Sequence, residues 1–349
     1  MAGYSPEPDI RRRKSVESHD FDELDLQLLH GLEVDARASF SRLAAVLGVS
    51  DQTVARRYRR LHTEGGLRVV GVRDAASLGQ DTWMLRLRCA PDAADSIARA
   101  LARRPDTAWI GLTSGGTEVV GQTSARTRGE HEELLLGKLP RTPSITEIRA
   151  HQLLHRFYGG PAGWLGKSRA LTDAQVAALR PSGTGRTSEP GGRESGITAD
   201  DEPLVTALER DGRATFAELR KATGRSESAV RRRLDQLLGS GTLFIDVQFD
   251  SEHFGYGIAA LLWITAAPAA LDAVGRALAT HREVATASAV SGPCNLFAVV
   301  VCRDTPELYA YVSARLGRLD GVQHVECTPM LRRVKQLKYE ERPTGRTVS

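Results

Sequence analysis

The sequence predicts an α+β protein with two winged helix-turn-helix domains, each followed by a ferredoxin-like βαββαβ domain. Three observations lead to this fold class. The 349-residue chain contains one unit twice, each unit opens with three helical patterns and a strand, and each closes with four strand patterns interleaved with two helical ones. At about 100–200 residues per domain, a chain of this length is expected to hold more than one domain.

The internal repeat is the most informative feature of the chain. The segment Asp35-Ala-Arg-Ala-Ser-Phe40 recurs 176 positions later as Asp211-Gly-Arg-Ala-Thr-Phe216. The same offset, without a gap, aligns matching residues from Asp25 with Asp201 to Leu85 with Leu261. Chance does not keep one register over so long a stretch, so the chain consists of two copies of one unit.

Each copy begins with a predicted winged helix-turn-helix. In the first copy, leucines recur at helical spacing over 21–33. Serine residues suited to N-capping open the next two helices, and glycine closes both, at 39–48 and 50–65. A strand pattern follows at 67–72, and a tight glycine turn between the second and third helices is typical of this motif. The second copy repeats the order with helices near 200–210, 215–223 and 226–239 and a strand at 243–249.

The third helix of each copy carries polar side chains on the face opposite its apolar stripe, which in the first copy is Val54, Tyr58 and Leu61. Arg bonds phosphates and guanine, and Gln pairs with adenine, so this face suits the major groove of DNA. The candidate DNA-binding residues of the first copy are Gln52, Thr53, Arg56, Arg57, Arg59 and Arg60. Those of the second copy are Ser228, Arg231, Arg232, Arg233 and Gln236.

The alternative interpretation is a solvated helix face in an arginine-rich chain, because 41 of the 47 basic residues are Arg. The occurrence of the same three-helix context in both copies favours DNA binding. Asp235 stands where the first copy has Arg59, and a carboxylate repels phosphate. The sequence therefore predicts asymmetric DNA contacts, with the first copy reading the stricter half of an imperfect palindrome.

A second module follows each helical domain. In the first copy, strands are predicted at 81–89, 107–112, 118–121 and 145–154, with helices at 94–104 and near 128–138. In the second, strands are predicted at 258–265, 284–290, 296–302 and 323–330, with helices near 269–280 and 305–317. This βαββαβ order gives a four-stranded antiparallel sheet with helices on one face. The other face must be buried, most simply against a second sheet, so the units have a reason to pair as an α+β barrel.

Several runs carry a family resemblance: Leu24-Asp-Leu-Gln-Leu-Leu29, the repeated hexapeptide at 35–40 and 211–216, and Leu43-Ala-Ala-Val-Leu-Gly-Val-Ser50. Over all but its tails and linker, the chain resembles the Lrp/AsnC, or feast-famine, transcriptional regulators of bacteria and archaea, in a tandem-duplicated form. The resemblance implies sequence-specific transcription control, double-stranded DNA as partner, a cytoplasmic location, and neither enzymatic activity nor a cofactor. It also implies that the second module mediates dimerisation and, in many members, binds an amino acid or related effector.

The resemblance places effector binding at the turn between the second and third strands of that module. The corresponding candidates are Ser114, Gly115 and Glu118 in the first copy and Ser291, Gly292 and Asn295 in the second. The second copy lacks the acidic side chain that could pair with an α-ammonium group, and Pro293 removes a backbone donor. The alternative is that both segments are simple hairpin turns.

The predicted domain boundaries follow the repeat. They are a flexible tail at 1–20, helix-turn-helix domains at 21–74 and 198–250, βαββαβ domains at 75–165 and 251–338, a Gly-, Pro- and Ser-rich linker at 166–197, and a tail at 339–349.

Composition narrows the functional classes. The net charge of +4 and pI of about 9.0 fit an anionic partner. No apolar run is long enough to span a bilayer, the four cysteines form no CxxC pair, and no histidine spacing fits a metal site.

Two other functional classes remain open. One is a sirohaem-decarboxylase-like enzyme built on the same tandem fold, for which His151 and His155 are the only hints. The other is an effector-sensing or oligomerisation protein without its own operator. The sequence leaves open the operator, the effector, the sign of regulation, and whether the units pair within or between chains.

Overall fold

The structure, a computed structural model, describes residues 21–124, 128–180 and 196–337. Each copy begins with three helices and a strand, which we call head 1 and head 2. Head 1 contains α1 (Glu23–Val34), α2 (Phe40–Leu47), α3 (Asp51–Thr63) and β1 (Arg68–Arg73). Head 2 contains α7 (Glu202–Arg210), α8 (Phe216–Thr223), α9 (Glu227–Gly239) and β6 (Leu243–Gln248).

Each head is followed by a βαββαβ module, as predicted, and the fold class is confirmed. The first module contains β2 (Trp83–Cys89), α4 (Ala94–Ala102), β3 (Thr107–Thr113), β4 (Glu118–Thr123), α5 (Arg128–Glu132) and β5 (Ile145–Tyr158). The second contains β7 (Ile258–Ala266), α10 (Leu271–Thr280), β8 (Val284–Val290), β9 (Leu296–Cys302), α11 (Thr305–Ala310) and β10 (Val322–Arg333).

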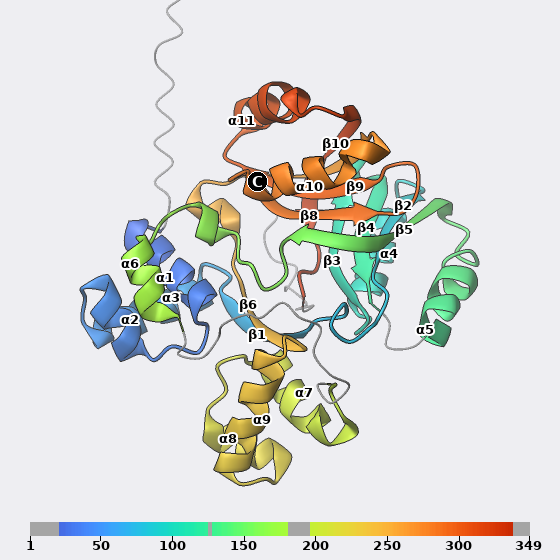
Figure 1. Cartoon of the computed structure of the whole chain (residues 1–349). Coiled ribbons are helices and arrows are strands. Elements are labelled where there is room, and N and C mark those ends of the chain that lie inside the picture. Colours follow the sequence, from blue (N-terminus) through green and yellow to red (C-terminus); the bar gives the residue numbers. More distant parts are fainter. Residues whose placement is uncertain (1–20, 125–127, 181–195, 338–349) are drawn as a thin grey trace, which may run out of the picture.

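The two sheets join edge to edge into one closed barrel with the strand order β10-β3-β4-β2-β5-β8-β9-β7 (Figure 1). The joints are the antiparallel pairs β5–β8 and β10–β3, each of which combines one strand from each copy. Closure leaves neither sheet with an unpaired edge. The two copies therefore pair within one chain, an arrangement that the sequence left open.

The last strand of each module extends beyond its predicted end. β5 pairs with β2 as far as Gln152 and then with β8 from Leu153 to Tyr158. β10 likewise pairs with β7 up to Pro329 and with β3 from Met330 onward. The sequence prediction stopped close to where pairing within each copy ends, because the remaining residues form a ladder only with the other copy.

The inner faces of the sheets pack against each other, while α4, α5, α10 and α11 cover the outer faces (Figure 1). The interior cluster is formed by Met84, Val120, Leu261, Trp263, Val290 and Phe297. Trp263 is fully buried there. This burial is the one expected for a sheet whose helices cover only one face.

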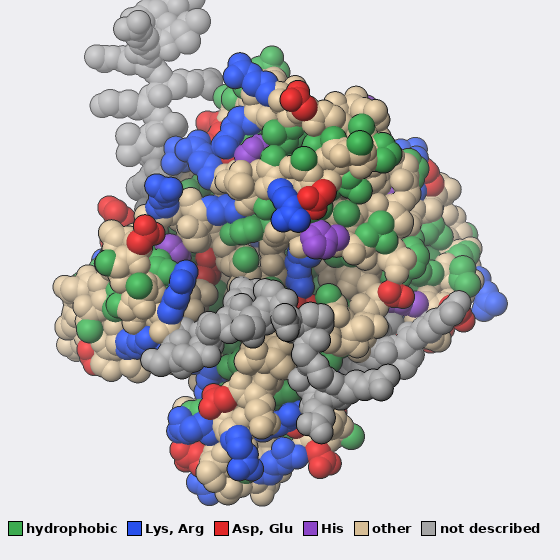
Figure 2. All heavy atoms as spheres, viewed as in Figure 1, with side chains coloured by type: hydrophobic (Ala, Val, Ile, Leu, Met, Phe, Trp, Pro, Cys, Tyr) green, Lys and Arg blue, Asp and Glu red, His purple; other side chains and the backbone are tan. Residues whose placement is uncertain are grey.

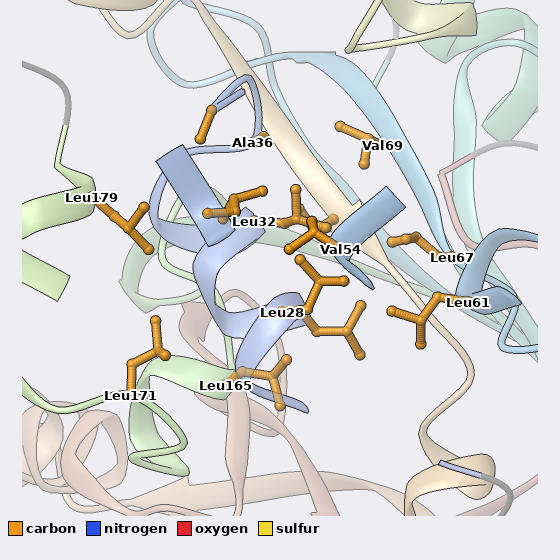
Figure 3. Close-up of a cluster of buried hydrophobic side chains, with 14 of the residues drawn as sticks. Leu28, Leu32, Ala36, Val54, Leu61, Leu67, Val69, Leu165, Leu171 and Leu179 are labelled. Atoms are coloured by element: carbon orange, nitrogen blue, oxygen red, sulfur yellow. The ribbon is translucent and has the colours of Figure 1, made fainter. Parts of the chain in front are cut away.

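The core of head 1 contains a contribution from outside its three helices (Figure 3). After β5 the chain forms α6 (Asp173–Leu179), which lies beside α1 and α2. Leu165, Leu171 and Leu179 of this segment are buried with Leu28 and Leu32 of α1. The first part of the range predicted as linker, 166–197, thus packs on head 1, while 181–195 lies outside the described residues.

A two-stranded ribbon joins the heads beneath the barrel, because β1 pairs antiparallel with β6 (Figure 1). Each head also rests on the strand of the other copy, α7 on β1 and α1 on β6. At head 2, the Arg73 guanidinium bonds Glu202 at 2.8 Å and Glu209 at 2.7 Å. These ion pairs connect head 2 to the first copy.

Two lysines make equivalent contacts between the copies. Lys335, after β10, donates to the carbonyl of Arg104 beyond α4 at 2.7 Å. Lys167, after β5, donates to the carbonyls of His281 and Val284 beyond α10. Burial lowers the pKa of each lysine to about 8. The chain that leaves each module is thus fastened to the other module.

Head 1 has two carboxyl groups where head 2 has an ion pair. Glu33, the counterpart of Glu209, faces Asp246 of β6 rather than an arginine, and its Oε2 is buried without a hydrogen-bond partner. Burial and the Asp246 charge raise the pKa of Glu33 to about 8, and burial raises the pKa of Asp246 to about 6. Since both values exceed those of an unfolded chain, folding binds protons here, and stability falls as pH rises from about 5 to 8.

We expect Glu33→Gln to remove much of this pH dependence. A neutral amide keeps the shape of the protonated carboxyl, so relative to wild type the variant should gain about 4 kcal/mol of stability between pH 5 and pH 8.5. Urea unfolding across that pH range measures the difference. Glu209→Gln is the matched control and should lower stability at both pH values because it breaks the pair with Arg73. Parallel pH profiles for wild type and Glu33→Gln would contradict this account.

Candidate nucleic-acid interface

The recognition helix of head 1, α3, begins at an N-cap and presents an exposed polar face. The Ser50 hydroxyl accepts a hydrogen bond from the backbone N–H of Thr53 at 3.1 Å and lies 2.9 Å from the Thr53 hydroxyl. Gln52, Arg56 and Arg59 are exposed, whereas Val54 and Leu61 are buried in the core. The predicted division into an inner stripe and an outer face therefore holds for these residues, and Thr53 lies at the border with its hydroxyl beside the cap.

Arg57 and Arg60, which were also predicted to contact DNA, make ion pairs within head 1. The Arg57 guanidinium bonds Asp22 at 2.7 Å and Asp25 at 2.9 Å, and Asp25 is fully buried. Arg60 lies over the ring of Phe21, 3.9 Å from Asp25 and 3.5 Å from Glu64. Both guanidinium groups hold α3 against α1 and its N-cap, so they position the recognition helix rather than extend its outer face.

The recognition helix of head 2, α9, has the same construction. Its N-cap, Ser226, accepts from the backbone N–H of Ala229 at 3.4 Å. Its predicted contact residues Ser228, Arg231, Arg232 and Gln236 are exposed and line one open depression together with Glu227 and Asp235. Figure 2 shows Lys and Arg side chains gathered over this head with Asp and Glu among them. Arg231 also stacks on the ring of Phe216 at 3.9 Å.

Arg233 repeats the inward placement of Arg57. Its guanidinium bonds both carboxylate oxygens of buried Asp201, at 2.7 and 2.9 Å, and this hydrogen bonding raises the pKa of Arg233. It also donates to Gln236 at 3.4 Å. The heads therefore share one internal pair, Arg57 with Asp25 and Arg233 with Asp201, which lies at positions related by the repeat.

The turn predicted to bind an effector in the first copy lies near one mouth of the barrel. Gly115 has a φ of 67°, which turns the chain sharply before β4. The Glu118 carboxylate accepts hydrogen bonds from Thr113 and Ser114, both at 3.0 Å, and from Arg86 at 2.8 Å. A positively charged ligand group would have to compete with Arg86 for this carboxylate.

The equivalent turn in the second copy is closed by contacts with neighbouring strands. The Asn295 amide exchanges two hydrogen bonds of 2.8 Å with the backbone of Ala266. The Ser291 hydroxyl accepts from the backbone N–H of Gln152 at 2.8 Å. A Cβ on Gly292 would lie 2.8 Å from the His151 ring, so the turn approaches β5 closely. Ser291, Gly292 and Asn295 thus all have structural roles in this turn, through hydrogen bonds or close packing against neighbouring strands.

Sequence reasoning missed the charged cluster around Arg86, beside the Glu118 turn. Arg86, 5% exposed, bonds Glu326 of the other copy through both terminal nitrogens, at 2.8 and 2.6 Å, and stacks on Trp263 at 4.8 Å. A cavity of about 170 Å³ is lined by Arg86, Arg88, Glu118, Glu147, Arg149 and Glu326. The available signal was Arg86 itself, a charged residue at an inward position of a strand that is otherwise largely apolar.

Within 21–124, 128–180 and 196–337, no cluster of three or more His, Cys, Asp or Glu side chains could hold a metal ion. Nor is any helix in this part of the chain long and apolar enough to cross a membrane.

Comparison with known proteins gives family matches to both heads and to the second βαββαβ module. The model of the AsnC-type helix-turn-helix domain matches residues 21–62 and 197–238, and that of the Lrp/AsnC ligand binding domain matches residues 259–339. An uncharacterized HTH-type transcriptional regulator of Pyrococcus abyssi is 30% identical over 140 residues, 40% of this chain and 88% of that protein. The HTH-type transcriptional regulator LrpA of Pyrococcus horikoshii is 28% identical over 140 residues, 40% of this chain and 99% of that protein.

A solved structure matches almost the whole chain. The siroheme decarboxylase NirDL has a TM-score of 0.60, is 14% identical, and is aligned over 91% of this chain and 94% of its own. At 14% identity, this similarity shows a shared fold and nothing about function. The alignment over nearly the full length of both chains indicates that the siroheme decarboxylase has the same overall arrangement.

We expect Arg57→Ala to destabilise head 1 rather than merely remove a positive charge. The substitution leaves the carboxylate of Asp25 buried without its main partner, and breaking a buried pair in this way costs about 3 kcal/mol or more. Thermal or urea unfolding measures the loss. Arg56→Ala, at the exposed neighbour, is the control and should change stability by less than about 0.5 kcal/mol. Equal stability of the two variants would show that the Arg57 pair is dispensable.

Proposed function

Because this chain belongs to the Lrp/AsnC family of transcriptional regulators, we propose that it reads one operator with both of its heads. In this proposal α3 and α9 enter the major groove of double-stranded DNA at two half-sites of a single site. The observation that carries the proposal is the presence, in one chain, of two N-capped recognition helices with exposed polar faces.

The contacts differ between the heads. For head 1 we assign Gln52, Arg56 and Arg59 to the DNA, with Thr53 at the border of the groove. For head 2 we assign Ser228, Arg231, Arg232 and Gln236. Arginine reaches phosphates and guanine, and glutamine pairs with adenine. Arg57, Arg60 and Arg233 act indirectly, through the internal ion pairs that fix each helix on its head.

Head 1 should make the stronger contacts. Asp235 is exposed on α9 at the position of Arg59 on α3, whereas the acidic first-turn residues Glu227 and Asp51 are matched between the two helices. Carboxylates near phosphates weaken binding through like-charge repulsion. The operator should accordingly be an imperfect palindrome, with stricter base preferences in the half that head 1 contacts.

A small effector, an amino acid or related molecule, is the second partner in this proposal. The turn with Ser114, Gly115 and Glu118 is the better candidate, because it retains a carboxylate beside a polar cavity. In the turn with Ser291, Gly292 and Asn295, the Ser291 hydroxyl and the Asn295 amide already form hydrogen bonds with the backbone of neighbouring strands. Binding of DNA implies access to the chromosome, so we place the protein in the cytoplasm. Adding amino acids singly to a DNA-binding assay tests the effector.

The enzymatic alternative is a decarboxylase of the kind that shares the tandem fold. We propose that the chain is not such an enzyme. The cavity of about 170 Å³ beside Arg86 is smaller than the roughly 300–1,000 Å³ of pockets for larger ligands, and its lining groups include the paired Arg86, Glu118 and Glu326. An iron porphyrin added to the protein should produce no saturable shift of its absorption spectrum. A saturable stoichiometric shift would favour the enzyme.

Selection from random double-stranded DNA with the purified chain should enrich one motif. On that motif, Arg56→Ala should weaken binding about tenfold or more, because one such arginine contact contributes about 1–3 kcal/mol. Arg232→Ala should weaken DNA binding about threefold, because Asp235 already makes the electrostatic potential on the outer face of α9 less positive. Electrophoretic shifts across a salt series measure both, and the logarithm of affinity should fall by about 0.9 per neutralised phosphate for each decade of salt.

Two results would contradict the proposal at different levels. If the purified chain binds no double-stranded DNA fragment at low ionic strength, the proposal that it is a DNA-binding protein is wrong. A larger loss from Arg232→Ala than from Arg56→Ala would reverse the ranking of the heads and leave DNA binding intact.

A further inference from the structure

The two heads touch each other directly through a reciprocal pair of arginines. Arg37, in the loop between α1 and α2, donates to the carbonyls of Gly212 at 2.5 Å and Ala214 at 2.9 Å. Arg213, its counterpart in the loop between α7 and α8, donates to the carbonyls of Ala36 at 2.5 Å and Ala38 at 2.8 Å. Each head thus supplies one guanidinium and two acceptors. We call this double contact the inter-head clamp.

Both arginines are held in position by their own loops. The Asp35 carboxylate accepts from the backbone N–H of Arg37 at 3.0 Å, and Asp211 accepts from that of Arg213 at 2.8 Å. Gly212 comes so close to the ribbon that an added Cβ would lie 3.1 Å from the backbone nitrogen of Val70. The loops therefore meet over the β1–β6 ribbon with little freedom to slide.

The clamp also touches the groups that support the recognition helices. Arg213 lies over the rings of Phe40 and Tyr58, at 5.1 and 5.4 Å, and Tyr58 belongs to α3. Arg37 lies 5.5 Å from the ring of Phe216, on which Arg231 of α9 also stacks. Each clamp arginine is therefore packed against the helix-turn-helix of the opposite head.

The clamp explains why one hexapeptide is shared so closely by the two copies. Residues 35–40 and 211–216 contain, in each copy, the supporting aspartate, the donor arginine, the two acceptor carbonyls, the N-cap of the next helix and the stacked phenylalanine. A contact that is symmetric about a two-fold axis requires the same residues on both sides.

From this geometry we infer that the inter-head clamp sets the spacing between the two half-sites that the protein accepts. Apart from the clamp, the heads are joined by the β1–β6 ribbon and by the contacts of α1 and α7 with its strands. These contacts fix each head on the ribbon, whereas the twist of a two-stranded ribbon between the heads is variable. Four charge-assisted hydrogen bonds between the loops, each stronger than a neutral one, remove that freedom. The separation and the angle between α3 and α9 then become properties of the folded chain.

The inference rests on the proposed function, because spacing has meaning only for a protein that reads two half-sites. Each base pair inserted between half-sites moves the second by about 3.4 Å and rotates it by about 34° around the DNA axis. A rigid pair of heads cannot follow an insertion of two base pairs, whereas heads without the clamp can follow it through a change in the twist of the ribbon that carries them.

The test uses the full chain and the motif enriched from random DNA, with its centre lengthened or shortened by one to three base pairs. Wild type should lose about tenfold or more in affinity at a change of two base pairs, a penalty of about 1.4 kcal/mol. The double variant Arg37→Ala with Arg213→Ala should lose about threefold or less across the series. Arg37→Lys with Arg213→Lys should fall between them, because lysine lacks the fork that holds two carbonyls.

Arg68→Ala is the matched control. Arg68 also donates to two backbone carbonyls, but both of these, His62 and Leu67, belong to head 1. Its removal should leave the spacing profile as sharp as that of wild type. Unfolding curves of all variants identify any general loss of structure.

A second measurement needs no DNA. Spin labels at Ala45→Cys and Lys221→Cys, which are exposed and equivalent positions on α2 and α8, report the distance between the heads by pulsed electron resonance. The partly exposed cysteines are first removed as Cys294→Ser and Cys327→Ser. The distance distribution should be narrow in the chain with an intact clamp and broad in the double alanine variant.

The results of these experiments distinguish failure of the proposed function from failure of the inter-head clamp to set the spacing. If wild-type protein enriches no motif, the proposed function fails, and the label distances still decide whether the clamp holds the heads together. If the double alanine variant keeps a sharp spacing profile, or loses affinity equally at every spacing with an unchanged distance distribution, the clamp does not set the spacing.

Discussion

The structure depends on hydrogen bonding between strands of different copies. A βαββαβ sheet carries helices on one face only, so its other face and both of its edges need a partner. The pairs β5–β8 and β10–β3 satisfy both needs at once, because they close eight strands into one barrel and turn the two inner faces toward each other. The β1–β6 ribbon continues the same antiparallel relation outside the barrel and brings the heads together. Every contact between heads follows from that pairing.

The fold was largely predictable because the evidence for it is local and occurs twice. Side-chain N-caps and apolar periodicity mark α2, α3, α8 and α9 without reference to the other copy, and apolar periodicity alone marks α4 and α10. Features that arise only from contact between distant segments were not predictable: the ends of β5 and β10, and the helix α6 within the predicted linker. Arg57 shows the same limit at the site. Periodicity places it at the border of the outer face of α3, and only the position of buried Asp25 shows that it turns inward.

Fusion allows the two halves of the molecule to differ. Arg86 in β2 and Trp263 in β7 lie opposite Val120 and Phe297 respectively, and the guanidinium of one stacks on the ring of the other. The two positions correspond in the sheets at an offset of 177, one more than the repeat of the heads. The sequence alignment of Leu85 with Leu261 therefore does not hold in these strands, because Leu85 packs on the helix side of its sheet and Leu261 in the barrel interior. In a dimer of identical chains both positions would carry the same side chain, and two arginines would repel each other where this pair attracts. The carboxyl pair of head 1, which replaces the ion pair of head 2, is a second such difference.

The same divergence has a consequence for recognition. In a homodimer, a substitution that adapts one recognition helix to its half-site changes the other helix as well, so the operator is driven toward symmetry. In this chain α3 can hold Arg59 while α9 holds Asp235 at the matching position. The inner residues are kept nevertheless: both heads retain the arginine–aspartate pair beneath the helix and the hexapeptide that joins the loops. On the recognition helices, Arg59 and Asp235 differ and are exposed, whereas the shared arginine–aspartate pairs and hexapeptides hold the heads in place. This distribution is the one expected if the two heads share one geometry but contact different half-sites, as proposed.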